Sequence, residues 1–132
     1  IQQDVERQLA QPLPPGKPLQ RKTPLRAKPR SKGNRAELEI VNLLKAHGWT
    51  GARRNWQSGG QGGGDILGVP AVSIEVKHRE ALNIWAALDQ CQQDASPTDL
   101  PLLCFRRNRT GWYAAVPLED LLELLKLREA QA

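Results

Sequence analysis

The sequence of 132 residues has no methionine, one phenylalanine, one tyrosine and two cysteines. No stretch is apolar for the ~18 residues that a membrane-spanning helix needs, so the sequence argues against such a helix. No signal-peptide pattern is present either. Because the chain begins at Ile1 and contains no methionine, we expect it to be an excerpt or a processed product.

The small number of cysteines and histidines argues against a zinc site. Cys91 and Cys104 do not form a Cys-x-x-Cys pair, and the two histidines, His47 and His78, are far apart in the sequence. Structural zinc sites use closely spaced cysteine and histidine ligands. We therefore expect unpaired thiols in a reducing compartment, and we predict a cytoplasmic protein.

Acidic residues are missing from one part of the chain. Between Lys17 and Arg35 there are eight basic residues and no acidic one, whereas residues 36–132 have ten basic and twelve acidic residues, a net charge of −2. Residues 11–30 contain six prolines, which favour an extended segment without a core of its own. We therefore predict a basic, proline-rich N-terminal extension, residues 1–30, and a folded domain, residues 31–132.

An extended segment with charge of one sign is typical of an arm that binds a polyanion, and nucleic acid is the common polyanion. A membrane-binding segment would need apolar anchors, which this extension lacks. The alternative interpretation is a solvated linker. In the DNA-binding interpretation, the phosphate-contacting residues are Lys17, Arg21, Lys22, Arg26, Lys28, Arg30 and Lys32.

Two short apolar runs flank a turn at residues 68–70 and carry charged residues at particular places. Asp65 opens the first run directly after three glycines, and Glu75 and Lys77 lie near the end of the second. Because strand side chains alternate, Glu75 and Lys77 share one face while their apolar neighbours face a core. If the runs pair as a hairpin, Asp65 lies near Glu75, and two close carboxylates need a cation such as Mg²⁺. The alternative is a solvated strand face with a weak ion pair.

The hydrophobic pattern predicts three helices and five strands in the folded domain. The helices cover residues 31–47, residues 81–94 and a segment that begins at Pro117. The strands are 49–55, the two runs of the hairpin, 101–105 and 112–116. Three antiparallel strands followed by a helical crossover to a parallel strand give an α/β domain with a mixed sheet. We interpret Trp85, in the second helix, as a core residue.

The first and last helices each carry a feature with two interpretations. Glu39 lies within the apolar stripe of the first helix, where it either pairs with Arg35 or points toward the metal site. The last helix has one apolar face, formed by Leu118, Leu121, Leu122 and Leu125. Leu124 and Leu127 lie off that face, which suggests a second buried surface and a dimer interface.

Several short motifs in a particular order support a family resemblance. They are Lys32-Gly33, Ala36-Glu37 with Glu39, Gly48-Trp49, Arg53-Arg54, Ser58-Gly59, Gly64-Asp65-Ile66, Glu75-Val76-Lys77 and Gln90. Together they resemble the PD-(D/E)xK nuclease superfamily, and within it the archaeal and phage Holliday junction resolvase-like members. The resemblance covers residues 32–93, with weaker support to residue 125. It implies a restriction-endonuclease-like core, in which helices flank a mixed central sheet. Gly64 stands where the family has proline.

The resemblance also implies roles for individual residues. Asp65 and Glu75 would ligate Mg²⁺, for which Mn²⁺ can substitute, and the Val76 carbonyl would be a further ligand. Glu39 would join the site through water or a second metal. Lys77 would orient the attacking water and help to deprotonate it. The residues expected to hold the substrate phosphate or neighbouring DNA are Arg35, Arg53, Arg54, Ser58 and Gln90.

The sequence therefore predicts a metal-dependent DNA endonuclease of prokaryotic or phage origin. The expected substrate is branched DNA such as a Holliday junction, and the expected assembly is a homodimer without a membrane partner. Three alternatives remain open. They are a nuclease that acts on linear DNA in repair or restriction, a non-catalytic DNA-binding module with the same fold, and a protein-interaction domain whose extension binds an acidic partner.

Overall fold

The computed structural model describes residues 29–56 and 63–132. The chain divides into two compact units, residues 1–32 and residues 33–132. Most of the predicted extension, with Lys17, Arg21, Lys22, Arg26 and Lys28, lies outside the described residues. The proposed domain boundary at residue 30 therefore stays a prediction.

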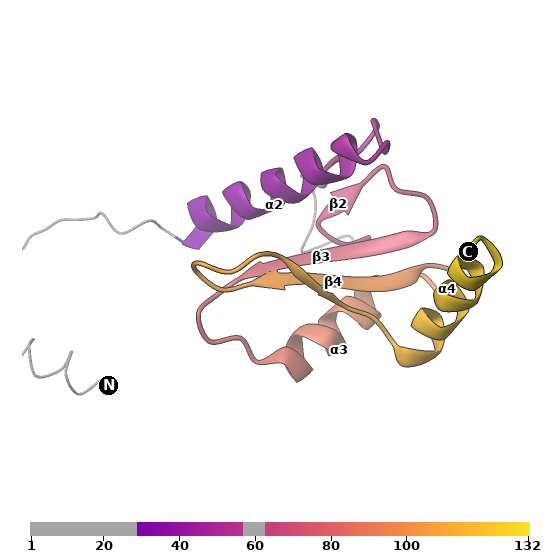
Figure 1. Cartoon of the computed structure of the whole chain (residues 1–132). Coiled ribbons are helices and arrows are strands. Elements are labelled where there is room, and N and C mark those ends of the chain that lie inside the picture. Colours follow the sequence, from indigo (N-terminus) through magenta and orange to yellow (C-terminus); the bar gives the residue numbers. More distant parts are fainter. Residues whose placement is uncertain (1–28, 57–62) are drawn as a thin grey trace, which may run out of the picture. The chain divides into compact units, whose positions relative to one another are not determined.

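The elements follow the predicted order of one helix, three strands, one helix, two strands and one helix (Figure 1). They are α2 (Pro29–Ala46), β1 (Arg53–Arg54), β2 (Ile66–Leu67), β3 (Val72–His78), α3 (Ile84–Asp94), β4 (Leu100–Arg106), β5 (Tyr113–Ala115) and α4 (Leu118–Ala130). The five strands form one sheet in sequence order. β3 and β4 are parallel and the other pairs are antiparallel. The predicted mixed sheet is thus confirmed, with α3 as the crossover.

The predicted first strand is too long. Only Arg53 and Arg54 pair with β2, and the preceding residues form tight turns. The Trp49 N–H donates to the Leu44 carbonyl at 3.0 Å, and the Ala52 N–H donates to the Trp49 carbonyl at 3.1 Å. Since these backbone groups are satisfied locally, they are not available to a neighbouring strand.

Helices α2 and α3 lie on opposite faces of β3 and β4 (Figure 1). On the α2 face, Ile74 and Val76 of β3 pack with Ile40 of α2 in one core cluster. On the other face, Leu103 of β4 packs with Cys91 of α3. The predicted core face of β3 is therefore confirmed. The opposite face, which carries Glu75 and Lys77, is also covered by a helix.

On helices α3 and α4, side chains that the sequence predicts to be buried are exposed in the structure. Trp85, in the first turn of α3, is 75% exposed, so its interpretation as a core residue is wrong. Helix α4 has no buried residue, and its four leucines at the predicted apolar face are between 40% and 67% exposed. Among the described residues, no helix is long and apolar enough to cross a membrane.

Candidate active site

Asp65 is held by backbone contacts with the neighbouring strand β3. Its N–H donates to the Ile74 carbonyl at 2.6 Å, and its carboxylate oxygen Oδ2 accepts the Val76 N–H at 2.8 Å. β2 begins one residue later, so the side chain of Asp65 takes the place of a strand partner for Val76. These contacts hold the carboxylate at the point where the β2–β3 pairing stops.

Gly64 allows this close approach. A Cβ at this position would lie 2.6 Å from the Ile74 carbonyl oxygen, which is closer than real Cβ contacts. Gly64 also has φ +78°, a conformation that proline cannot adopt because its ring holds φ near −65°. The departure from the family's proline therefore accompanies a different backbone conformation just before Asp65.

Glu75 is the most deeply buried acidic residue at this site, with 2% of its surface exposed. Burial raises its pKa to about 9, and a hydrogen bond with Asp94 and the nearby charge of Asp65 act in the same direction. Burial also raises the pKa of Asp65, against the lowering effects of the Val76 N–H and the Lys77 charge. The side chains of Asp65 and Glu75 are near enough to influence each other: Glu75 lowers the pKa of Asp65, whereas the charge of Asp65 raises that of Glu75. We call Asp65, Glu75, Asp94 and Glu37 the acidic site.

Lys77 and Gln90 lie on the α3 side of the acidic site. Lys77 is half-buried, and its positive charge lowers the pKa of both Asp65 and Glu75. Lys77 and Gln90 line the same cavity of about 150 Å³, together with Arg79. The structure therefore brings together four of the predicted site residues, Asp65, Glu75, Lys77 and Gln90.

Glu37, two positions before the predicted Glu39, is the carboxylate of α2 that interacts with this group. Burial raises the pKa of Glu37, and the negative charge of Asp65 raises it further, whereas Arg54 and Lys77 lower it. Residues two apart on a helix do not share a side, so Glu39 points elsewhere. Its Oε1 accepts hydrogen bonds from Arg106 at 3.2 Å and Trp112 at 3.0 Å.

The predicted phosphate-binding arginines have different surroundings. Arg54 Nε donates to Glu37 Oε1 at 3.0 Å, its Nη2 donates to Asn34 Oδ1 at 2.7 Å, and its guanidinium carbon lies 4.3 Å from the ring centre of Trp56. Arg53 is exposed and donates to the Gly51 carbonyl at 3.2 Å. Arg54 is thus joined to the acidic site through Glu37, whereas Arg53 is not.

The other residues predicted to contact DNA are either at exposed or half-buried positions of α2 or outside the described residues. Arg35 is an exposed residue of α2, and Lys32 is half-buried in the first turns of the same helix. Ser58 and the side chain of Arg30 lie outside the described residues. Their roles stay predictions.

The donors of the acidic site fit a hard divalent cation. In residues 29–56 and 63–132, no group of three or more His, Cys, Asp or Glu side chains is arranged to hold a metal ion as it stands. Mg²⁺, however, is usually bound by one or two carboxylates, with water and substrate phosphate as the other ligands. Asp65 and Glu75 supply two carboxylates whose pKa values are raised, chiefly by burial and despite the positive charge of Lys77, so a bound cation would favour their ionised forms.

The Val76 carbonyl also has a suitable direction. The N–H and C=O groups of one strand residue point toward the same neighbouring strand. Because the Val76 N–H points to Asp65, its carbonyl points to the same side of β3. The set of oxygen donors is therefore two carboxylates and one carbonyl, which is the chemistry that Mg²⁺ or Mn²⁺ prefers.

Two residues of the acidic site are missing from the sequence prediction. Glu37 could have been found, since it lies four residues before the buried Val41 and so borders the apolar stripe of α2. Asp94 is the last residue of α3, and its carbonyl accepts the Gly63 N–H at 3.0 Å. No local pattern distinguishes Asp94 from an ordinary helix-end residue.

The five-stranded mixed sheet with its flanking helices defines an α/β protein with a restriction-endonuclease-like fold. A family model described as "Phage putative PDDEXK endonuclease" matches residues 28–131. The chain therefore belongs to this family of PD-(D/E)xK nucleases, which act on DNA and generally depend on a divalent metal. Neither the curated proteins nor the solved structures include a significant match.

Proposed function

We propose that the protein is a Mg²⁺-dependent endodeoxyribonuclease that cuts branched DNA. The observation that supports this proposal best is the buried carboxyl group of Glu75 next to the half-buried one of Asp65, with Lys77 beside them. A purely structural role does not account for such a pair, because bringing two carboxylates together away from water is unfavourable unless a cation or a proton compensates them.

Each residue of the site has a defined task in this proposal. Asp65, Glu75 and the Val76 carbonyl hold Mg²⁺, or Mn²⁺ in its place. A cation held there would supply a lower pKa for a water molecule and stabilisation of the charge that develops on the phosphate. Lys77 donates hydrogen bonds to the attacking water and to the phosphate, and balances their negative charge.

Glu37 takes the role that the sequence assigned to Glu39, because its charge acts on Asp65 whereas Glu39 binds Arg106. Arg54, now paired with Glu37, is close enough to the acidic site to exchange this partner for a phosphate when DNA arrives. Gln90 holds the phosphate from the α3 side, since it shares a cavity with Lys77.

The basic extension, residues 1–30, contacts DNA phosphates outside the nuclease domain, residues 31–132. Deletion of residues 1–28, which leaves all of α2 in place, should weaken binding and reduce its dependence on salt. Cleavage at saturating DNA should persist. A salt dependence equal to that of the full chain would remove the extension from the DNA interface.

The homodimer proposal is supported by the exposed leucines of α4. The helix has Glu119 and Asp120 in its first turn, and its last two turns contain Lys126, Arg128 and Glu129, so that end has one net positive charge. If two copies pair antiparallel about a two-fold axis, the acidic end of each helix lies beside the basic end of the other. The leucine faces then cover each other, which removes apolar surface from water.

Light scattering coupled to size-exclusion chromatography tests the dimer. We expect wild type to have the mass of two chains, and Leu122→Lys to have the mass of one. The matched control is Leu38→Lys, which changes a leucine of similar exposure on α2. A monomeric wild type, or loss of the dimer in both variants, would contradict pairing through α4.

The decisive test of the function compares labelled DNA substrates with and without metal. A four-way junction, a linear duplex of matched sequence and a single strand are incubated with Mg²⁺ or with EDTA. We expect paired nicks in the junction with Mg²⁺ only, and none with Asp65→Asn. Asp89→Asn is the control, because Asp89 is an exposed acidic residue of α3 outside the acidic site.

Each other outcome points to one of the alternatives. Metal-dependent cutting of linear duplex with equal efficiency would keep the nuclease and exclude junction selectivity. Tight binding without cleavage of any substrate would indicate a DNA-binding module. Loss of binding and cleavage together in Asp65→Asn would indicate a folding defect, which circular dichroism can detect.

A further inference from the structure

A second cavity adjoins the one that contains Lys77. Its volume is about 330 Å³, which is at the lower end of the ~300–1,000 Å³ that is usual for small-molecule sites. Phe105, Tyr113 and Arg107 are among its lining residues, and Arg79 and Leu82 line both this cavity and that of Lys77 and Gln90. The two cavities therefore share a wall. We call the second cavity the arginine–tyrosine pocket.

The sheet register connects this pocket to the acidic site. Lys77 of β3 pairs with Phe105 of β4, and Phe105 pairs with Tyr113 of β5. Directly paired residues project on the same face of a sheet, and adjacent strands are ~4.8 Å apart. Tyr113 is thus two strands, or roughly 10 Å, from Lys77 on the face that α3 covers. This separation is comparable to that between a phosphate and a base one or two nucleotides away.

The aromatic residues of the pocket are open to solvent. Tyr113 is 65% exposed, and its ring centre lies 6.4 Å from that of Phe105, with an angle of 35° between the planes. The two rings are tilted relative to each other, and the Tyr113 ring stays accessible. An accessible flat ring beside basic groups is suited to stacking with a nucleobase.

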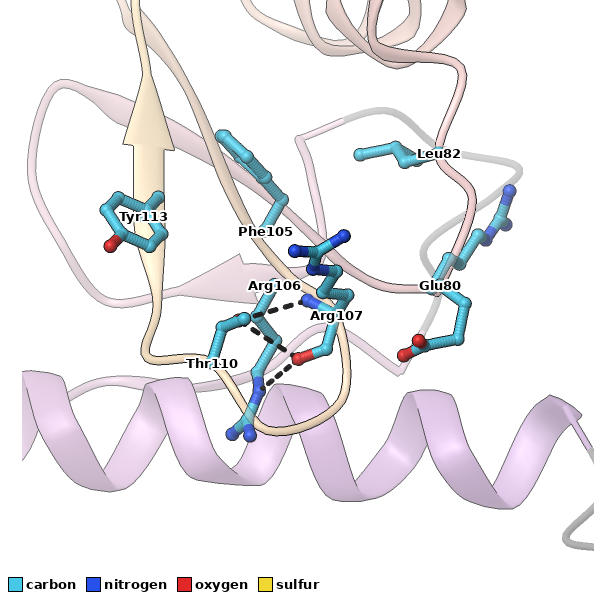
Figure 2. Close-up of a pocket in the computed structure, with 8 residues that line it drawn as sticks. Glu80, Leu82, Phe105, Arg106, Arg107, Thr110 and Tyr113 are labelled. Atoms are coloured by element: carbon cyan, nitrogen blue, oxygen red, sulfur yellow. Dashed lines mark hydrogen bonds between the residues drawn. The ribbon is translucent and has the colours of Figure 1, made fainter.

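Arg107 and Arg106 have different directions in Figure 2. The Arg107 guanidinium points into the space between Phe105 and Leu82, whereas that of Arg106 turns away toward α2, where it binds Glu39. The turn that carries Arg107 is held by Thr110, whose hydroxyl accepts the Arg107 N–H at 3.3 Å and donates to the Arg107 carbonyl at 3.0 Å. Arg107 is therefore fixed at its backbone, and within residues 29–56 and 63–132 its guanidinium has no ion pair, although Glu80 lines the same pocket.

We propose that the arginine–tyrosine pocket receives an unpaired nucleobase of the DNA substrate, next to the phosphate that is cut beside Lys77. The base stacks on Tyr113, and Arg107 and Arg79 contact the flanking phosphates. This proposal rests on the proposed nuclease function and adds a reason for its selectivity. A base in an intact duplex enters such a pocket only after it leaves the stack and its partner, whereas a base pair next to a branch point lacks a continuous stack on one side and opens at lower cost.

Fluorescence of 2-aminopurine tests this pocket, because stacking quenches this base analogue. The probe is a duplex with one unpaired 2-aminopurine, and binding is measured without cleavage in EDTA. We expect wild type to quench the probe and to bind it more tightly than a fully paired duplex. Tyr113→Ala should lose the quenching and about tenfold in affinity for the unpaired probe, with little change for the paired duplex.

Two further variants separate stacking from folding. Tyr113→Phe keeps the ring and should restore quenching and affinity. Trp85→Ala removes another exposed aromatic residue, 75% exposed against 65% for Tyr113, that does not line this pocket, and should behave as wild type. Equal quenching by Tyr113→Ala and wild type would overturn the pocket, as would an equal loss of affinity for both duplexes.

The experiments can reject the proposed base-binding pocket and the proposed nuclease function independently of each other. If wild type quenches the probe but cleaves no DNA with Mg²⁺, the base-binding pocket is supported and the nuclease proposal fails. If wild type cleaves DNA and Tyr113→Ala changes neither the quenching nor the affinity for unpaired probe, the nuclease proposal is retained and the pocket fails.

Discussion

The acidic site and the arginine–tyrosine pocket flank Lys77, but they differ in how their charges are compensated. In the acidic site, Glu75 is almost completely buried and its pKa is raised to about 9. In the pocket, the arginines are close to solvent, and Arg106 already has Glu39 as a partner. Burying unpaired charge lowers stability, whereas a solvated charge has little effect on it.

This difference shows that function and stability conflict at the acidic site. Neutralising one of its carboxylates should raise the free energy of unfolding of the protein and lower its cleavage activity. Substitutions in the pocket should weaken DNA binding without a comparable change in the free energy of unfolding. The following substitutions test this contrast.

The largest expected effect is on cleavage by Glu37→Gln. Because the charge of Glu37 acts on Asp65, its loss should lower the cleavage rate by about 10²–10⁴-fold, the range found for catalytic acid–base groups. Glu39→Gln is the matched control on the opposite side of α2 and should stay within a few-fold of wild type. Gel assays of nicked DNA measure the cleavage rates. Equal rates for Glu37→Gln and Glu39→Gln would contradict the assignment of Glu37, rather than Glu39, to the acidic site.

The next effect is on the free energy of unfolding in Gly64→Ala. A Cβ at Gly64 would collide with the Ile74 backbone, and φ +78° is unfavourable for alanine, so we expect a loss of about 1–3 kcal/mol. Gly111, in the loop between β4 and β5, has open space around it, so Gly111→Ala should be neutral or slightly stabilising. Urea unfolding curves measure both. Similar midpoints for the two variants would argue against the close approach at Asp65.

The pH dependence of stability gives a smaller but directional effect. An unfolded glutamate ionises near pH 4.5, whereas the folded protein keeps the proton on Glu75 to about pH 9. The unfolded state therefore binds fewer protons across this window, and the stability of the metal-free protein should fall as pH rises from 4.5 to 9. Glu75→Gln should flatten this dependence and raise the thermal midpoint at pH 8.

A divalent cation should oppose the same loss, since it replaces the proton between the carboxylates. We expect Mg²⁺ to raise the thermal midpoint of wild type more at pH 8 than at pH 5, and to have little effect on Glu75→Gln. Calorimetry at several pH values measures this change. Identical pH profiles for wild type and Glu75→Gln would contradict the burial of an uncompensated carboxylate.

The smallest effect is expected at the contact between α2 and the β4–β5 turn. Glu39 and Arg106 form a partly exposed ion pair, and such pairs contribute about 0.2–1 kcal/mol. A double-mutant cycle with Glu39→Gln and Arg106→Gln should give a coupling energy in this range. A coupling of several kcal/mol would mean that this side of α2 is under as much electrostatic constraint as the acidic site.

Much of the fold could be predicted from local patterns. The alternation in residues 72–77 predicts which side chains of β3 face the core, and the structure confirms it for Ile74 and Val76. The order of helices and strands and the parallel pairing of β3 with β4 are also confirmed. The predictions that fail, the long first strand and the buried Trp85, concern segments where the sequence pattern fits either environment.

The candidate site could be predicted only in part. Asp65, Glu75 and Lys77 lie within one hairpin, so their proximity follows from a short stretch of sequence. Glu37 and Asp94 belong to helices whose rotation on the sheet depends on packing of the whole core. A helical pattern gives the apolar stripe, but it does not say which carboxylate at its border reaches a particular strand.

By itself, the sequence determined the order of the elements, the two-sided pattern of β3 and the concentration of positive charge in residues 17–35, ahead of the slightly acidic residues 36–132. These properties depend on alternation, helical period and charge composition, which act over a few residues. Only the tertiary structure decided that Glu37 rather than Glu39 joins Asp65, that Asp94 contacts Glu75, and that Tyr113 shares a face with Lys77. These contacts join residues distant in sequence, so they are set by strand register and by the packing of α2 and α3 on the sheet.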